Sequence, residues 1–256
     1  MTTKVSVFII TFNEAAHIEE AIKSVSSMDE IILVDSGSTD DTVKIAERLG
    51  VKTVFQPWLG YAKQKSFAMN LCKNEWCFNL DGDEIVPKEC LDEIIKIIES
   101  DKADAIRLPI SDYFMGQELP KTVKKRSIVR LFKKNKIQYP LHRNVHENVI
   151  VDGTEVSAKN NIIHWGYNNV ELLMSKQNQY SSLRALDKIT GNKKSSYRKI
   201  IFIFPLMFIK SFFIRGLWRA GIRGFIYTLI ECMYAFLKEA KLYEHESVKK
   251  QNKDKN

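Results

Sequence analysis

Three clusters of polar residues follow short apolar runs in the first part of the chain, and their side chains are of types that bind ligands. The clusters are Thr11-Phe12-Asn13-Glu14, Asp35-Ser36-Gly37-Ser38-Thr39-Asp40-Asp41 and Asp81-Gly82-Asp83-Glu84. A carboxylate after a strand commonly caps a helix, so one such cluster alone indicates little. The carboxyl ends of neighbouring parallel strands meet at one edge of a sheet, where open α/β sheets bind ligands. Three clusters at that edge therefore favour a binding site.

The elements that would position these clusters alternate regularly. Apolar, β-branched runs predict strands, and amphipathic stretches between them predict helices. The expected strands are 5–10, 30–34, 51–55 and 76–80, and the expected helices are 15–25, 42–49, 62–72 and 87–99. Nearly continuous apolar strands separated by helices indicate a parallel sheet covered on both faces. Shorter strand candidates follow at 106–110, 127–132, 149–151 and 162–165, and the pattern is helical from residue 169.

The order and spacing of the clusters match a known family. SVFIITFNE at 6–14, ILVDSGSTD at 32–40 and NLDGDE at 79–84 together resemble family 2 glycosyltransferases of the GT-A fold. The resemblance is close over residues 4–100 and looser over 101–170. It implies an α/β protein with a mostly parallel, Rossmann-like sheet and helices on both faces, followed by a helical, membrane-associating extension.

We expect the following division of the chain. Residues 1–170 form the GT-A catalytic domain, with a nucleotide-sugar half at 1–100 and an acceptor-side half at 101–170. Residues 171–246 form an amphipathic helical region, and 247–256 form a basic disordered tail.

The resemblance implies a metal-assisted reaction on a nucleotide diphosphate sugar. A hard divalent cation held by oxygen ligands binds a diphosphate and stabilises it as a leaving group, and Mg²⁺ or Mn²⁺ suits this role. In the family the last Asp of Asp-x-Asp holds the metal, which is Asp83 here. His164 matches a late histidine that completes the metal shell in many members, although a lone histidine after an apolar strand is also a common structural residue.

Other matched positions imply contacts with the donor. Asp81 matches the Asp that contacts the ribose or sugar, and Asp35 matches the Asp that binds the base, commonly uracil. Lys65 matches a basic residue that neutralises phosphate, with a solvated helix lysine as the alternative. Thr11, Asn13 and Glu14 match the nucleotide contacts after the first strand.

An inverting displacement also needs a base near the acceptor hydroxyl. The segment Val145-His146-Glu147 resembles the family segment that supplies this group, so Glu147 is the expected general base. Charge balance with nearby Arg143 is the alternative role for this glutamate.

The stretch FQPWLGYAKQK at 55–65 narrows the resemblance to the lipopolysaccharide core β-glucosyltransferases. We therefore expect transfer of a hexose, glucose, from a UDP-linked donor to a lipid-anchored saccharide. Two alternatives remain open at this point: transfer to a polyprenyl phosphate, and a non-catalytic nucleotide-sugar-binding membrane adaptor. The sequence leaves the oligomeric state open.

The net charge of +8 is unevenly distributed. Residues 121–143 carry nine bases and no acid, residues 188–256 have a net charge of +10, and the remainder has −11. This distribution, without a basic motif interleaved with stacking aromatics, disfavours a nucleic-acid binder. We expect the stretch 121–143 to help hold the acceptor.

The C-terminal basic region suggests a membrane contact. Arg215, Arg219 and Arg223 recur every four residues, which predicts a stripe on one helix face with Trp218 on the apolar side. Such a helix would lie on an anionic membrane surface, and a helix packed on the protein with a solvated arginine face is the alternative. The expected location is the cytoplasm, peripheral on the cytoplasmic face of the inner membrane. Two observations agree with this location. No leader pattern is expected at the N-terminus, and the four cysteines form no metal-ligand or disulfide pattern.

Overall fold

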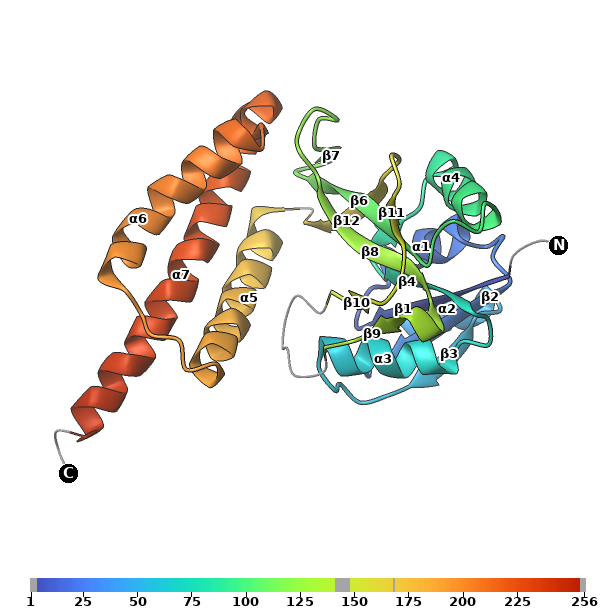
Figure 1. Ribbon diagram of the computed structural model, residues 1–256, viewed down its shortest axis with the longest axis horizontal. Helices are drawn as coiled ribbons and strands as arrows, with labels where there is room; N and C mark the ends of the chain where they lie inside the picture. Colours follow the sequence, from blue (N-terminus) through green and yellow to red (C-terminus); the bar gives the residue numbers. More distant parts are fainter. Residues whose placement is uncertain (1–3, 141–147, 168, 254–256) are drawn as a thin grey trace. The chain divides into compact units, whose positions relative to one another are not determined.

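A computed structural model describes residues 4–140, 148–167 and 169–253 (Figure 1). The chain divides into two compact units. The first unit comprises residues 1–112 and 125–166, and the second comprises 113–124 and 167–256. We describe each unit separately.

One mixed sheet organises the first unit. Its strand order is β3 (Lys52–Phe55), β2 (Glu30–Asp35), β1 (Val5–Thr11), β4 (Trp76–Asp81), β8 (Arg126–Lys133), β6 (Ala105–Phe114), β12 (Ile162–Tyr167) and β5 (Glu84–Ile85). The four strands from β3 to β4 are parallel, whereas β8 is antiparallel to both β4 and β6. Residues Thr11, Asp35 and Asp81 therefore end three adjacent strands at one edge.

Short elements complete the sheet and its margins. β11 (Glu155–Ser157) pairs in parallel with β6, and β7 (Gln117–Glu118) pairs antiparallel with β6. A separate two-stranded sheet joins β9 (Ile137–Gln138) to β10 (Ile150–Val151), and the 3₁₀ turn η1 (Lys134–Lys136) precedes β9.

Helices cover both faces of this sheet because alternate strand residues point to opposite sides. On one face Val7 and Ile9 pack with α1 (Ile18–Ser24), α2 (Thr42–Arg48) and α4 (Lys88–Glu99). On the other, Phe8 and Ile10 pack with α3 (Tyr61–Leu71). In α4 the buried residues Cys90, Ile94 and Ile98 recur every four positions, which gives the helix one apolar face.

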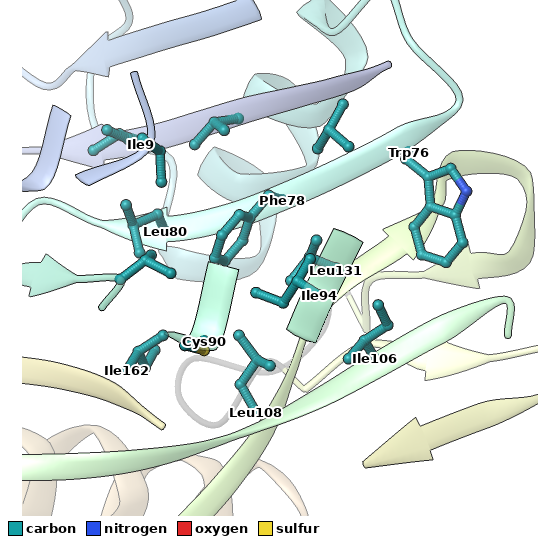
Figure 2. Close-up of a cluster of buried hydrophobic side chains, with 14 of the residues drawn as sticks. Ile9, Trp76, Phe78, Leu80, Cys90, Ile94, Ile106, Leu108, Leu131 and Ile162 are labelled. Atoms are coloured by element: carbon teal, nitrogen blue, oxygen red, sulfur yellow. The ribbon is translucent and has the colours of Figure 1, made fainter. Parts of the chain in front are cut away.

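Figure 2 shows the larger core, where Cys90 and Ile94 of α4 lie among side chains from the sheet. The labelled strand residues are Ile9, Trp76, Phe78, Leu80, Ile106, Leu108, Leu131 and Ile162. The predicted α/β fold class, with helices on both faces of the sheet, is thus confirmed. The periodicity of the sequence predicts neither the strand β5 nor the antiparallel pairing of β8 with β4 and β6.

The second unit is a set of helices with one hairpin segment. Its helices are α5 (Val170–Thr190), α6 (Tyr197–Phe208), the π-helix η2 (Ile209–Ile214), the 3₁₀ turn η3 (Leu217–Ala220) and α7 (Gly221–Lys253). α7 lies between α5 and α6 (Figure 1). Leu217, Tyr227 and Ile230 pack with Leu173 of α5 and with Phe114 of the hairpin.

Ion pairs and hydrogen bonds fasten α7 to its neighbours. Lys188 of α5 pairs with buried Glu239, and the Lys241 ammonium donates to Asn178 and Ser181 of α5. α7 continues as helix through 247–253, part of the stretch that we expected to be a disordered tail. Within the described residues, Leu217–Lys249 is the single helical stretch long and apolar enough to cross a membrane by length and composition.

Candidate active site

The loops after β1 and β2 are fastened to each other by polar contacts. The backbone N–H of Asn13 donates to Ser38 Oγ (2.8 Å), and the backbone N–H of Thr39 donates to Asn13 Oδ1 (2.8 Å). Asn13 has a φ of 55°, a left-handed conformation that asparagine tolerates better than most residues. The Glu14 N–H donates to Thr42 Oγ1 (2.8 Å). These hydrogen bonds hold Asn13 and Glu14 in the loops that follow the ends of β1 and β2.

Asp35 shapes the loop that follows it. Its Oδ2 accepts hydrogen bonds from the N–H groups of Gly37 (2.8 Å) and Ser38 (2.9 Å), and its Oδ1 accepts one from Ser38 Oγ (2.5 Å). Gly37 has a φ of 106°, which a side chain would strain. Asp35, the predicted base-binding residue, is buried, and its hydrogen bonds stabilise this turn.

The middle of the sheet edge contains a buried hydroxyl with no hydrogen-bond partner in the described part of the chain. This atom is Thr11 Oγ1. A Cβ at Gly82 would lie 3.2 Å from Thr11 Oγ1 and 3.3 Å from the Glu14 side chain. A glycine at position 82 therefore keeps space beside an unused polar atom, a feature that suits a bound polar ligand.

Asp81 lies between two cations. Lys65 Nζ is 3.2 Å from Asp81 Oδ1, and Arg130 Nη2 is 2.8 Å from Asp81 Oδ2. Arg130 also donates to Glu84 Oε1, and Glu84 Oε2 accepts from the Asp81 N–H (3.1 Å). Lys65, Arg130 and Glu84 are all buried. The alternative of a solvated Lys65 is wrong, since this side chain reaches inward to the Asp-x-Asp motif.

The electrostatics of this four-residue network follow from burial and pairing. Burial raises the pKa of Asp81, but Arg130 and Lys65 outweigh that effect and hold its pKa well below the usual range. Burial raises the pKa of Glu84, and Arg130 only partly offsets this increase. The network holds two acids and two bases, so its formal charge is balanced without a ligand.

Asp83 and His164 come together although 80 residues separate them. β5 pairs with β12 so that Glu84 faces His164 in register, and the Trp165 N–H donates to the Asp83 carbonyl (2.8 Å). These pairings place His164 Nε2 3.5 Å from Asp83 Oδ2. Both side chains are buried.

The other ring nitrogen of His164 is held by a residue from β6. Nδ1 lies 3.1 Å from Asp112 Oδ1, and Arg126 Nη2 lies 3.1 Å from the same carboxylate oxygen. Burial lowers the pKa of His164, but Asp83 and Asp112 more than compensate and raise its pKa to about 9. Each ring nitrogen thus faces a carboxylate, and a metal bound at Nε2 would displace the proton that this nitrogen shares with Asp83.

The residues present fit a divalent cation. A Cβ at position 166 would overlap Asp83 Oδ2 and lie 2.6 Å from His164 Nε2, so Gly166 leaves open the space next to both atoms. Among the described residues no group of three or more His, Cys, Asp or Glu side chains forms a cage. Two protein ligands are consistent with Mg²⁺, which commonly binds one or two protein groups together with substrate phosphates and water.

Several residues of this site were not expected from the sequence. Arg130, Arg126 and Asp112 join the expected residues through antiparallel strands, and Glu84, the last residue of the third cluster, is a buried partner of Arg130. The composition of β8 is a usable signal, because Arg130 interrupts an otherwise continuous apolar run from Ile128 to Phe132. The predicted base Glu147 lies outside the described residues, as does His146.

The three arginines of the expected membrane stripe do not share one helix. Arg215 follows η2, Arg219 belongs to the 3₁₀ turn η3 and Arg223 belongs to α7, and the glycines between them, Gly216 and Gly221, have φ values of 87° and 61°. Arg215 ion-pairs with Glu231, and Arg223 donates to the carbonyls of Phe114 (3.0 Å) and Gln117 (3.2 Å), all within the second unit.

Arg219 behaves differently from Arg215 and Arg223. It is exposed, and its guanidinium lies over the Trp218 ring at 4.7 Å from the centroid. The prediction of a single helical arginine stripe is therefore wrong, because two of its three members bind groups within their own unit.

Comparison with known proteins identifies the family. The family model described as "Glycosyl transferase family 2" matches residues 6–153, which include the three strand-end clusters. The chain belongs to glycosyl transferase family 2. The predicted resemblance is confirmed, and the protein is a glycosyltransferase.

Relatives of this glycosyltransferase extend over its whole length. The lipopolysaccharide core biosynthesis glycosyltransferase LpsC of Rhizobium meliloti (strain 1021) is 35% identical over 254 residues, 95% of this chain and 93% of LpsC. An uncharacterized glycosyltransferase of Rickettsia bellii (strain RML369-C) is 39% identical over 258 residues, 95% of this chain and 87% of the relative.

A solved structure shares the fold. The crystal structure of S. aureus TarS 1–349 in complex with UDP-GlcNAc has a TM-score of 0.51 at 16% identity, and it covers 98% of this glycosyltransferase and 92% of TarS 1–349. This likeness supports the GT-A fold.

Proposed function

We propose that this glycosyltransferase is an inverting, metal-dependent hexosyltransferase. It moves a hexose, glucose, from a UDP-linked donor to a lipid-anchored saccharide of the lipopolysaccharide core. The observation that carries the proposal is the Asp83–His164 pair, which is backed by Asp112 and opens onto the space kept by Gly166. The name of LpsC, which matches over nearly its full length, supports the core saccharide as acceptor.

The donor would bind along the edge formed by the ends of β1, β2 and β4. Asp35 would bind the base, Asp81 the ribose or sugar, and Thr11, Asn13 and Glu14 would make further contacts to the nucleotide. The buried Thr11 hydroxyl offers an unused donor or acceptor for this purpose. Lys65 would contribute its positive charge to the phosphates from its position beside Asp81.

Asp83 and His164 would hold Mg²⁺ or Mn²⁺. When bound, such a cation supplies positive charge to the diphosphate and makes it a better leaving group. Asp112 would hold the Nδ1 side of His164, and Nε2 would exchange its proton for the cation next to Asp83.

Glu147 would act as the general base in the displacement. It takes the proton of the acceptor hydroxyl, whose oxygen forms a bond to the anomeric carbon while the bond to the diphosphate breaks. The product has the inverted configuration, and UDP leaves with the electron pair of the broken bond.

A lipid-anchored acceptor requires access to a bilayer. We therefore infer a peripheral position on the cytoplasmic face of the inner membrane, in contact with anionic lipid. The basic C-terminal region supports this location, since residues 188–256 have a net charge of +10.

The test measures release of UDP and product mass with a panel of nucleotide sugars and a membrane extract as acceptor. Asp83→Ala should abolish metal-dependent turnover, and Glu147→Gln should reduce it by at least a hundredfold without weakening donor binding. Undiminished transfer in Glu147→Gln would instead support a polyprenyl phosphate acceptor, which is already ionised. Donor binding without UDP release from any acceptor would support the adaptor.

A further inference from the structure

The helix α6 and the π-helix η2 expose a row of large apolar side chains. Its members are Ile201, Phe202, Leu206, Ile209, Phe213 and Ile214, each between 51% and 71% exposed. They recur mainly every three to five residues, which keeps them on one side of a helix. None of the α6 side chains is fully buried, although most of the helix is apolar. Packing within the second unit therefore does not account for this composition.

A second exposed row adjoins the first on α7. The Phe225 ring lies 6.1 Å from Phe208 and 6.0 Å from Phe212, so α7 and the α6–η2 segment meet at this ring. From there α7 exposes Ile222, Phe225, Leu229 and Met233, again every three to four residues. We call these two rows together the α6–α7 apolar surface.

The charges around the α6–η2 row and the start of α7 have one sign, and Glu231, within the α7 row, is paired with Arg215. The 43 residues from 188 to 230 contain nine Lys or Arg and no Asp or Glu. Arg198 and Lys199 are exposed just before the row begins, and Lys210 is exposed next to Ile209. Arg219, over the exposed Trp218 ring, adds a further cation near the start of α7. Between residues 201 and 209, every position that is exposed carries an apolar side chain.

This arrangement matches the chemistry of an anionic bilayer surface. Apolar side chains enter the boundary between headgroups and acyl chains, and flanking Lys and Arg reach the lipid phosphates. A second copy of the chain is a poorer occupant, because its own Arg198, Lys199 and Lys210 would approach cations of the same sign.

We propose that the α6–α7 apolar surface is the part of this protein that inserts into the interface of an anionic membrane. It takes the place of the expected arginine stripe, since Arg215 and Arg223 bind groups inside the second unit. The inference deepens the proposed function, because it names the surface through which a transferase for lipid-linked acceptors reaches the bilayer.

The test is co-sedimentation of the full chain with vesicles of phosphatidylcholine and phosphatidylglycerol (3:1), without donor or acceptor. The test variant is Ile201→Ser/Leu206→Ser/Phe213→Ser. Its matched control is Leu172→Ser/Met174→Ser/Leu186→Ser, which removes three exposed apolar side chains from α5 in the same unit. The α6–η2 variant should partition at least tenfold more weakly, and the α5 variant should change by less than twofold.

A charge variant tests the same surface without touching its apolar residues. Arg198→Gln/Lys199→Gln/Lys210→Gln should weaken binding to the phosphatidylglycerol vesicles at least fivefold and leave binding to pure phosphatidylcholine unchanged. If the circular dichroism spectrum of the α6–η2 serine variant differs from that of the wild type, the charge variant alone tests whether this surface binds the membrane.

Three results would overturn the proposal: no sedimentation of the wild type, equal binding by the α6–η2 and α5 variants, or a wild-type dimer that the α6–η2 variant converts to monomer. Because no sugar transfer is measured, these results are independent of the reaction. Loss of transfer in Glu147→Gln with intact vesicle binding would concern the proposed function alone.

Discussion

Arg130→Met should be one of the most destabilising single substitutions in the first unit. Arg130 is 2% exposed and is bonded to both Asp81 and Glu84. Methionine has a comparable length, so the cavity it leaves is small, and the main effect is electrostatic. Removal of one partner from a buried ion pair costs about 3–5 kcal/mol, because the other charge stays buried without compensation. Lys65 still pairs with Asp81, so Glu84 is the group that loses its direct ion-pair partner.

The same reasoning predicts a specific rescue. In Arg130→Met/Glu84→Gln the stranded carboxylate is gone, and Asp81 and Lys65 remain as a balanced pair. The double variant should therefore be less destabilised than the sum of the two single variants by about 0.5–3 kcal/mol, the range for groups in one ion-pair network. Lys133→Met on the same strand is the control, since Lys133 pairs with Asp101 and Asp104, which both keep contact with solvent, and such surface pairs contribute about 1 kcal/mol or less each.

The assay is urea unfolding of the full chain without metal, followed by tryptophan fluorescence. Three of the four tryptophans, Trp58, Trp76 and Trp165, belong to the first unit, so the signal reports mainly on the unit that contains Arg130. The reasoning is refuted if Arg130→Met is no more destabilised than Lys133→Met. It is also refuted if the effects of Arg130→Met and Glu84→Gln simply add.

Two further predictions concern the strand that carries His164. Asp112→Asn should weaken Mn²⁺ binding about 10–100-fold, because the Nδ1 of His164 loses its carboxylate partner. The affinity is measured from the free Mn²⁺ signal in electron paramagnetic resonance. An unchanged affinity would contradict a metal at this histidine. Glu93 of α4 accepts hydrogen bonds from the N–H groups of Lys159 (2.9 Å) and Asn160 (2.8 Å), just before β12. Burial raises the pKa of Glu93, but these N–H groups outweigh it, so the pKa lies below 4.5. The stabilisation is thus present above pH 4.5 and is lost as the pH falls through the folded-state pKa. Glu93→Gln should lower the free energy of unfolding by about 1 kcal/mol at pH 7, and its difference from wild type in urea unfolding should shrink toward pH 3; a difference that grows with acidity would exclude this role.

The nucleotide side of the fold was predictable because its signals are local. Each strand from β1 to β4 is a short apolar run that ends at a polar cluster, and parallel neighbours must bring those ends to one edge. Thr11, Asp35 and Asp81 therefore could be placed from spacing alone. The hydrogen bonds by which Asp35 holds its own turn could not be placed in this way, because they depend on the conformation of Gly37 and Ser38.

The residues that support the site could not be found in this way, since their partners are set by antiparallel register. Arg130 belongs to a stretch of nine bases that we expected to face the acceptor. Pairing of β8 with β4 and β6 instead turns Arg130 toward Asp81 and Glu84, and Arg126 toward Asp112. A count of charges along the chain does not distinguish a cation that neutralises a buried carboxylate from one that attracts an anionic partner.

The arginines of the C-terminal region illustrate the opposite error, in which a local sequence pattern is given too much weight. Three arginines at intervals of four define a stripe only if the helix between them is continuous, and Gly216 and Gly221 interrupt it with left-handed backbone. Two of the arginines then satisfy carbonyls and a glutamate in their own unit. What remains exposed is the apolar α6–α7 surface, with its cations at the margins. The basic charge in this region is therefore better understood as the border of a hydrophobic contact than as the contact itself.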